Sequence, residues 1–249
     1  MQYGICNLSI VPVRLQPEDA NEMVTQLLYG EHFKILEERG KWSRIRIASD
    51  SCEGWIDNRQ YLKIEEAAFY ELIDVKPIYS ADLIEYLIDE HGNLISIPLG
   101  AVLNFTPHLK HSHDGSVISG KKEKSNLIST ALLYLNAPSI WGGKTPFGID
   151  CSGFTQMVYM LNGYSLLRNS AQQATQGEAL SFIEESEPGD LAFFDNAEGI
   201  ITHVGLMMKD NYIIHVHGKV RIDRIDHSGI FNTELNRHTH QLRVIKKII

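Results

Sequence analysis

The sequence predicts an α+β protein in which one or two small β-barrels precede a domain of helices packed on an antiparallel sheet. A length of 249 residues is more than the roughly 100–150 residues of one compact domain, so two or three small domains are expected. Short β-like runs separated by turn signals fill the first 66 residues. After residue 125, helical patterns precede a series of β-like runs. We therefore expect domains at residues 1–66, 67–124 and 125–249.

Composition and charge exclude several classes of protein. Hydrophobic residues make up 43% of the chain and charged residues 22%, as in ordinary globular proteins. The formal net charge of −8 repels polyphosphates and anionic lipids, so neither nucleic acid nor a membrane is an expected partner. The first residues lack the basic and apolar segments of a secretory signal, and no apolar run approaches ~20 residues. We expect a cytoplasmic protein, and the sequence indicates no oligomeric state.

The first two predicted domains are both of β type. In the first, the runs predicted as strands are residues 10–14, 26–28, 32–38, 42–47 and 54–56. Gly40, Gly30 and the segment 49–51 separate them as turn signals. The apolar segments of residues 67–109 predict a second small β module, and the polar segment 110–124 predicts an exposed connection or hairpin.

The third domain begins with two predicted helices. The first carries one apolar stripe and ends before Pro138; the stripe consists of Leu127, Ile128, Ala131, Leu132 and Leu135. The second is expected to start near Asp150 and to end at Asn162 and Gly163, a C-terminal cap pattern. Predicted strands follow at residues 191–194, 203–208, 212–217, 220–225 and 242–249.

Cys151 is the candidate nucleophile. The chain has three cysteines without paired spacing, which argues against a disulfide framework. Cys151 falls in the first turn of the second predicted helix, where unpaired amides and the helix dipole favour a thiolate. The alternative is a small buried residue without chemistry, which is our interpretation of Cys6 and Cys52.

His203 and His215 are the candidate partners of this thiol. If their strands form a hairpin with an odd loop centred on Lys209, the two residues lie directly opposite each other on one face. An even loop would place them on opposite faces. The odd loop predicts a triad in which His203 is the base of Cys151 and His215 orients His203.

A metal centre is the alternative use of the histidines. Three His-x-His pairs each place two imidazoles on one strand face: His111 with His113, His215 with His217, and His238 with His240. The chain has no Cys-x-x-Cys and no His-Glu-x-x-His motif. We therefore expect no metal and no cofactor, with His111 and His113 in a solvated loop.

Five segments in order resemble the NlpC family of papain-like cysteine peptidases. They are 134–143 (YLNAPSIWGG), 147–154 (FGIDCSGF), 168–172 (RNSAQ), 187–194 (EPGDLAFF) and 202–205 with 214–215 (THVG, IH). The Gly-Lys-Trp at 40–42 and the Glu-Gly-Trp at 53–55 are similar to the bacterial SH3-like module. The whole chain resembles intracellular γ-D-glutamyl-L-diamino-acid endopeptidases.

This resemblance implies hydrolysis of the γ-D-glutamyl–diamino acid bond in murein tripeptides or tetrapeptides with a free N-terminal L-Ala. Cys151, His203 and His215 match the catalytic cysteine, the histidine and the polar third residue of the family. Two further functions stay open, namely a catalytically weak protein that binds wall peptides and a less selective wall hydrolase.

The resemblance also implies a substrate site. Its residues are Asp150, Ser152 and Ser170 for the D-glutamyl part, and Glu22 for the free amino end. The alternatives are plain helix capping for Asp150 and Ser152, and a solvated side chain for Glu22.

The chain departs from the family at two cleft positions. It has Ser139 and Cys52 where relatives typically carry tyrosines. Both changes remove a hydroxyl donor and part of an apolar wall.

Overall fold

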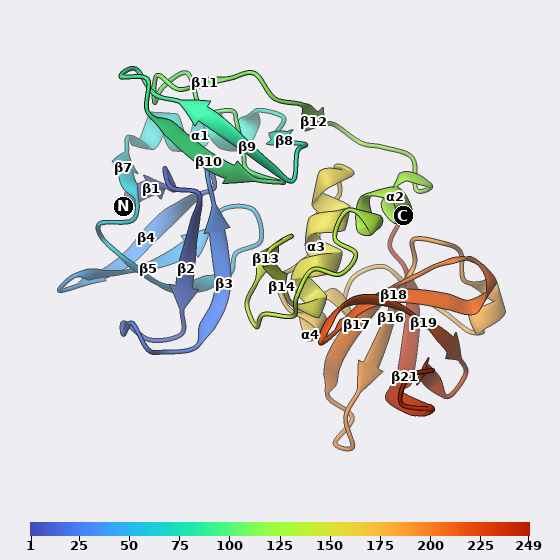
Figure 1. Ribbon diagram of the computed structural model, residues 1–249. Coiled ribbons are helices and arrows are strands. Elements are labelled where there is room, and N and C mark those ends of the chain that lie inside the picture. The colour runs from blue at the N-terminus through green and yellow to red at the C-terminus, as the bar shows by residue number, and fades with distance from the viewer. The chain divides into compact units, whose positions relative to one another are not determined.

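The computed structural model describes every residue from Met1 to Ile249. The chain divides into two compact units, Met1–Gly120 and Lys121–Ile249 (Figure 1). The division falls four residues before the boundary expected at 124, and residues 1–66 and 67–120 belong to one unit. No helix has both the length and the apolar composition needed to cross a bilayer.

A seven-stranded antiparallel sheet with the order β3-β2-β6-β5-β4-β1-β7 forms most of the first unit. Its strands are β1 (Gln2–Ile5), β2 (Ile10–Arg14), β3 (Met23–Leu28), β4 (His32–Arg39), β5 (Trp42–Ile47), β6 (Glu53–Asp57) and β7 (Leu62–Ile64). All five predicted strands are present, while β1 and β7 were not predicted. Alternating residues such as Val11, Val13, Ile45 and Ile47 form the core of this sheet.

The rest of the first unit combines one helix with short strands. The elements are α1 (Glu66–Asp74), β8 (Ile78–Ser80), β9 (Ile84–Ile88), β10 (Leu94–Pro98), β11 (Ser112–His113) and β12 (Val117–Ser119). Residues 110–124 are exposed or half-buried throughout, as expected for a surface connection, but they do not form a hairpin, because β11 pairs with β9 and β12 pairs with β8. His111 is not in a solvated loop either, since its Nδ1 lies 2.8 Å from the Tyr29 hydroxyl.

The second unit begins with its helices. They are α2 (Asn126–Leu132), α3 (Cys151–Leu161) and α4 (Ser170–Gln173). Two 3-10 turns, η1 (Ile183–Glu185) and η2 (Lys209–Asn211), come later, between strands. A small hairpin of β13 (Lys144–Thr145) and β14 (Gly148–Ile149) precedes α3. As predicted, α3 starts after Asp150 and ends at Asn162, followed by Gly163 with a positive φ of 82°.

A closed antiparallel barrel follows the helices. The strands are β15 (Glu178–Leu180), β16 (Leu191–Asp195), β17 (Ile201–Met207), β18 (Tyr212–His217), β19 (Lys219–Asp226), β20 (Gly229–Asn232) and β21 (Arg237–Lys247). The order runs β15-β21-β16-β17-β18-β19-β20, and β20 also pairs with β21. This last pairing closes β16 to β21 into a ring, so the predicted antiparallel sheet is a barrel.

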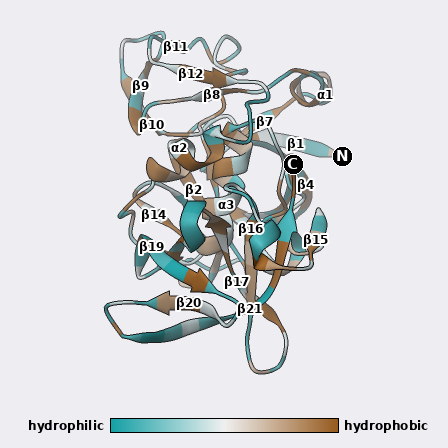
Figure 2. Cartoon of the chain, turned by 90° about the vertical axis from the view of Figure 1, so that its right-hand side faces the viewer, coloured by the Kyte–Doolittle hydropathy of each residue, from teal (hydrophilic) through white to brown (hydrophobic).

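β17 is buried on both faces, whereas β19 alternates between buried and exposed residues. Outward residues such as Val204 and Leu206 lie on the side of β17 that packs against α3. Inward residues such as Met207, Ile213 and Ile225 form a separate apolar cluster inside the ring. The alternation is visible as mixed hydrophilic and hydrophobic colours along β19 in Figure 2.

Candidate active site

Cys151 is the first residue of α3. Asp150 caps this helix from an extended conformation, and its Oδ1 accepts a hydrogen bond of 2.6 Å from the Gly153 N–H. The Sγ of Cys151 lies 4.0 Å from the Thr202 carbonyl oxygen. Helix α3 therefore presents its first side chain to the start of β17, the strand that carries His203.

The protonation of Cys151 differs from the sequence-based expectation. Burial, followed by the nearby Asp150 carboxylate, raises the pKa of the Cys151 thiol to about 11. The backbone N–H groups of Val204 and Ser152 lower this pKa, but by less. The expected shift toward thiolate at the helix start is wrong for the free protein, because desolvation outweighs the helix dipole. Cys151 is a neutral thiol that needs a base.

His203 and His215 lie on the same face, as predicted, but the predicted register is wrong. The hairpin pairs Gly205 with His215 and Met207 with Ile213, so the loop is centred on Asp210 instead of Lys209. The slip of the register by two positions keeps the face of every side chain. His203 is therefore a diagonal neighbour of His215, and the residue directly opposite His215 is a glycine. A Cβ on Gly205 would lie 2.9 Å from the Cβ of His215, so the glycine leaves room for this imidazole.

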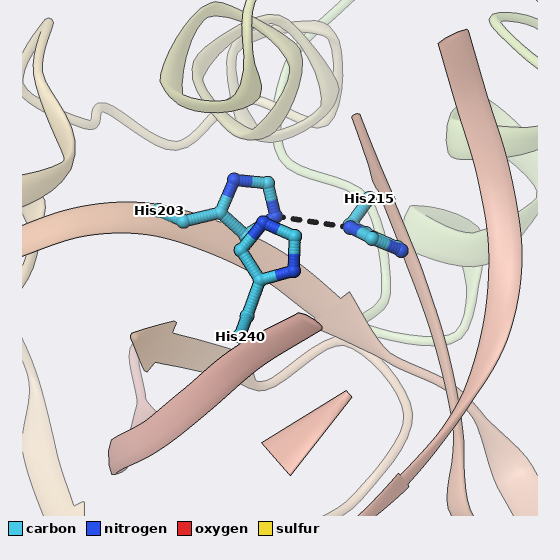
Figure 3. Close-up of side chains that lie close together, drawn as sticks. All are labelled: His203, His215 and His240. Carbon is cyan, nitrogen blue, oxygen red and sulfur yellow. Dashed lines mark hydrogen bonds between the residues drawn. The ribbon is translucent and has the colours of Figure 1, made fainter. Parts of the chain in front are cut away.

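The two imidazoles belong to a longer chain of hydrogen bonds. The Nε2 of His203 lies 3.0 Å from the Nδ1 of His215 (Figure 3). The Nε2 of His215 lies 3.0 Å from the Oδ2 of Asp223. Arg221 donates to the same carboxylate from Nε at 2.7 Å and from Nη2 at 2.9 Å. His203, His215, Asp223 and Arg221 are thus connected from one barrel strand to the next.

This chain occupies one end of the barrel interior. His203 lies on the same inward face of β17 as Gly205 and Met207. Asp223 lies on the same inward face of β19 as Ile225. The inward face therefore changes from apolar at one end of the barrel to polar at the other. His240 of β21 also lies at this end, with its ring stacked on His203 at a centroid distance of 4.1 Å (Figure 3).

Burial keeps these imidazoles neutral. It lowers the pKa of His203 well below 6.5, and the neighbouring His240, His215 and His217 add to the effect. Burial also lowers the pKa of His215, although the hydrogen bond that His215 donates to Asp223 acts in the opposite direction. A neutral imidazole has one ring nitrogen free to accept a proton, so His203 can act as a base. Figure 3 shows the second nitrogen of His203 on the side of the ring away from His215.

One group of histidines has the proximity of metal ligands. Ring nitrogens of His203, His215 and His240 all lie within 4.8 Å of one another. The facing nitrogens of His203 and His215 share a hydrogen bond, which occupies the lone pair that a metal would need. The three His-x-His pairs considered from the sequence are not the grouping that the fold produces, because His238 pairs with Asp226 instead.

The residues expected to bind the D-glutamyl group lie around the start of α3 and at α4. The Asp150 carboxylate caps α3, accepts from the Gly142 N–H, and pairs with Arg168 at 2.7 Å. Ser152 is buried, with its Oγ 3.1 Å from Nη1 of Arg168, and Ser170 is the buried first residue of α4. The capping alternative is therefore confirmed for Asp150. Arg168, which the sequence reasoning did not single out, connects Asp150 with Ser152.

The other predicted positions lie at the surface or in the first unit. Glu22 is exposed directly before β3, and its carbonyl oxygen accepts from the Leu15 N–H. Cys52 packs against the core of the first sheet, as its structural interpretation expects. Ser139 is exposed and forms a bridge to Ile149 beside the β13–β14 hairpin.

Three kinds of similarity agree with this site. The NlpC/P60 family matches residues 137–240, and the bacterial dipeptidyl-peptidase SH3 domain matches residues 13–60. A γ-D-glutamyl-L-lysine dipeptidyl-peptidase of Bacillus subtilis is 27% identical over 226 residues, covering 78% of this chain and 72% of the relative. Dipeptidyl-peptidase 6 of Lysinibacillus sphaericus is 24% identical, covering 85% of this chain and 87% of the relative.

A solved structure shows the same fold along the whole chain. An NlpC/P60 family protein from Bacillus cereus superposes with a TM-score of 0.80 at 18% identity, covering 99% of both chains. The chain thus matches a bacterial dipeptidyl-peptidase SH3 domain in residues 13–60 and an NlpC/P60 domain in residues 137–240.

Proposed function

We propose that this protein is an endopeptidase that hydrolyses the γ-D-glutamyl–diamino acid bond of murein peptides with a free N-terminal L-Ala. The observation that carries this proposal is the hydrogen bond between His203 and His215, with the thiol of Cys151 4.0 Å from the carbonyl oxygen of Thr202, the residue before His203. Two similar proteins of Bacillus species bear the name γ-D-glutamyl-L-lysine dipeptidyl-peptidase. We further propose that the protein acts in the cytoplasm on peptides released during wall recycling.

The proposed reaction begins from a neutral thiol and a neutral imidazole. As Sγ of Cys151 attacks the γ-carbonyl carbon, Nδ1 of His203 accepts the thiol proton. Collapse of the tetrahedral intermediate breaks the C–N bond, and His203 gives its proton to the leaving amine of the diamino acid. The γ-glutamyl thioester is then hydrolysed by a water that His203 deprotonates, which restores the thiol and releases L-Ala-D-Glu.

The proposed substrate contacts in the second unit lie at the starts of α3 and α4. Ser152 and Ser170 bind the D-glutamyl group, and Asp150 acts by holding Arg168 in place. Glu22 pairs with the free ammonium of L-Ala, a role that rests on the family resemblance.

A panel of synthetic peptides tests the proposal. The substrates are L-Ala-γ-D-Glu-L-Lys, its meso-diaminopimelate analogue, the α-linked isomer and the N-acetylated tripeptide, with products identified by mass spectrometry. We expect release of the free diamino acid from γ-linked peptides with a free amine, and complete loss after treatment with iodoacetamide. The α-linked isomer should stay intact.

Each other outcome contradicts a part of the proposal. Binding of the tripeptide without turnover would favour a wall-peptide binding protein. Equal cleavage of the acetylated peptide would favour a less selective wall hydrolase. Activity lost with a chelator and restored by zinc would favour the metal alternative.

A further inference from the structure

Asp223 is a fully buried carboxylate below the proposed histidine pair. It lies on β19 inside the barrel, where it contacts His215 and Arg221. Burial raises the pKa of its carboxyl, but the hydrogen bonds from His215 and Arg221 outweigh this, so the pKa is lowered. Arg221 is itself held by Glu234, with Nη1 2.9 Å from its Oε2. The carboxylate is therefore ionised and fixed.

An ionised Asp223 sets the direction of every hydrogen bond above it. A carboxylate only accepts, so the Nε2 of His215 must carry its proton. A neutral His215 then has an unprotonated Nδ1, which accepts from the Nε2 of His203. The Nε2–H tautomer of neutral His203 leaves Nδ1 as the free acceptor. One charged group thus decides which nitrogen of an imidazole two steps away can take a proton.

We propose that Asp223, held by Arg221, is a positioning residue that selects the tautomers of His215 and His203 in which Nδ1 of His203 is the base for Cys151. The proposal rests on the proposed function for its catalytic meaning. Without the carboxylate, His215 can carry its proton on Nδ1 and donate to His203 instead. His203 would then hold its proton on Nδ1, the nitrogen that must be unprotonated in order to accept the thiol proton of Cys151.

The same carboxylate acts on the charge that develops during the reaction. When His203 takes the thiol proton, a positive charge enters a buried site. The groups around His215 are Asp223 and Arg221 from β19, His203 from β17, His217 from β18 and His240 from β21. Glu234 stands behind Arg221. Asp223 is the one carboxylate in direct contact with the histidine pair, so its removal makes protonation of that pair harder.

The pH dependence of turnover separates this role from a structural one. We expect Asp223→Ala to lower kcat/KM about ten- to a hundredfold, the loss seen when a group that orients a functional imidazole is removed. The acidic limb of the profile should move to lower pH by about one unit, because the carboxylate favours the protonated pair. Asp223→Asn keeps an acceptor without the charge and should move the limb with a smaller loss of rate.

A matched control is available on the same strand. Asp226 also pairs with a histidine, His238, at 3.0 Å, but at the surface. Asp226→Asn should leave both the rate and the acidic limb unchanged. Thermal unfolding of each variant checks the fold, and Arg221 keeps Glu234 as a partner in the Asp223 variants.

A second measurement needs no substrate. Nitrogen-15 NMR of the histidine rings in a Cys151→Ala background should show His215 and His203 protonated on Nε2, and Asp223→Ala in that background should shift proton occupancy to Nδ1. If the unaltered protein cleaves none of the peptides, the proposed function fails while this spectrum still judges Asp223. Protonation of His215 on Nδ1 with Asp223 present, or an acidic limb that stays in place in Asp223→Ala, would overturn the inference.

Discussion

Two histidine–aspartate pairs that share strand β19 differ in their burial, and this difference separates the functional pair from the other. His215 with Asp223 and His238 with Asp226 have the same Nε2–Oδ2 distance of 3.0 Å. Asp223 and Asp226 are three residues apart on β19 and so lie on opposite faces. The side chains of the first pair are 0% and 1% exposed, and those of the second 42% and 47%.

The difference between the pairs lies in their surroundings. An exposed pair competes with water and is screened by salt, so it contributes about 0–1 kcal/mol. A buried pair keeps its geometry and direction, since no water offers an alternative partner. Enclosure in the barrel therefore gives His215 one fixed hydrogen-bond acceptor, Asp223, whereas the surface pair can exchange its partner for water.

The largest effect in this comparison is expected at His203. His203→Gln removes the group that accepts the proton of a thiol whose pKa is raised to about 11. Loss of general base catalysis should lower kcat/KM by about 10²–10⁴-fold. Steady-state kinetics on the γ-linked tripeptide measures this, and a loss of less than tenfold would show that another group activates Cys151.

A smaller loss is expected at His215. His215→Ala acts through His203 and leaves the base in place, so we expect about a ten- to hundredfold loss and a measurable residual rate. A double variant with His203→Gln should be no worse than His203→Gln alone, because groups that act as a unit are not additive. If the losses of the two single variants add up in the double variant, His215 does not act through His203.

The buried histidines should also make the second unit sensitive to acid. Burial lowers the pKa of His240 to about 4, with His215 and His217 adding to the effect. A lowered folded pKa gives stability that is complete above the unfolded value of 6.5 and is lost as the pH falls toward 4. His240→Phe should reduce this acid-dependent loss by about 1 kcal/mol after allowance for screening. Urea unfolding at pH 7 and pH 4.5 compares the two proteins, and equal pH dependence would refute the assignment.

The smallest effect is expected at the exposed pair. His238→Gln removes a surface ion pair and should change the free energy of unfolding by about 0–1 kcal/mol without changing the rate. Unfolding and kinetics measured in parallel with His215→Ala check this. A similar loss of activity in both variants would mean that burial is not what separates the pairs.

The sequence predicts the elements that depend on local pattern. Residues 212–217 are rich in β-branched and aromatic side chains and form β18 as expected, and Asp150 with Gly163 marks both ends of α3. The common face of His203 and His215 was predictable although the loop centre was not, because only the parity of the loop decides the face.

The parts that the sequence did not predict depend on distant contacts. Asp223 and Arg221 reach the histidine pair only after β19 has paired with β18, and His240 only after the barrel has closed. The one available signal was the presence of Arg221 and Asp223 on the same face of β19 as Ile225. The thiol of Cys151 is neutral because it is buried against the start of β17. The position of a residue at a helix start does not predict such a tertiary contact.

The central claim is that Cys151 is the nucleophile. Replacing each of the three free cysteines in turn tests this claim most directly. Cys151→Ala, Cys6→Ala and Cys52→Ala proteins should be incubated with L-Ala-γ-D-Glu-L-Lys and the products followed by mass spectrometry. The account predicts that Cys151→Ala releases no lysine while both other variants release it at rates close to the unaltered protein. Normal release by a folded Cys151→Ala protein would contradict it.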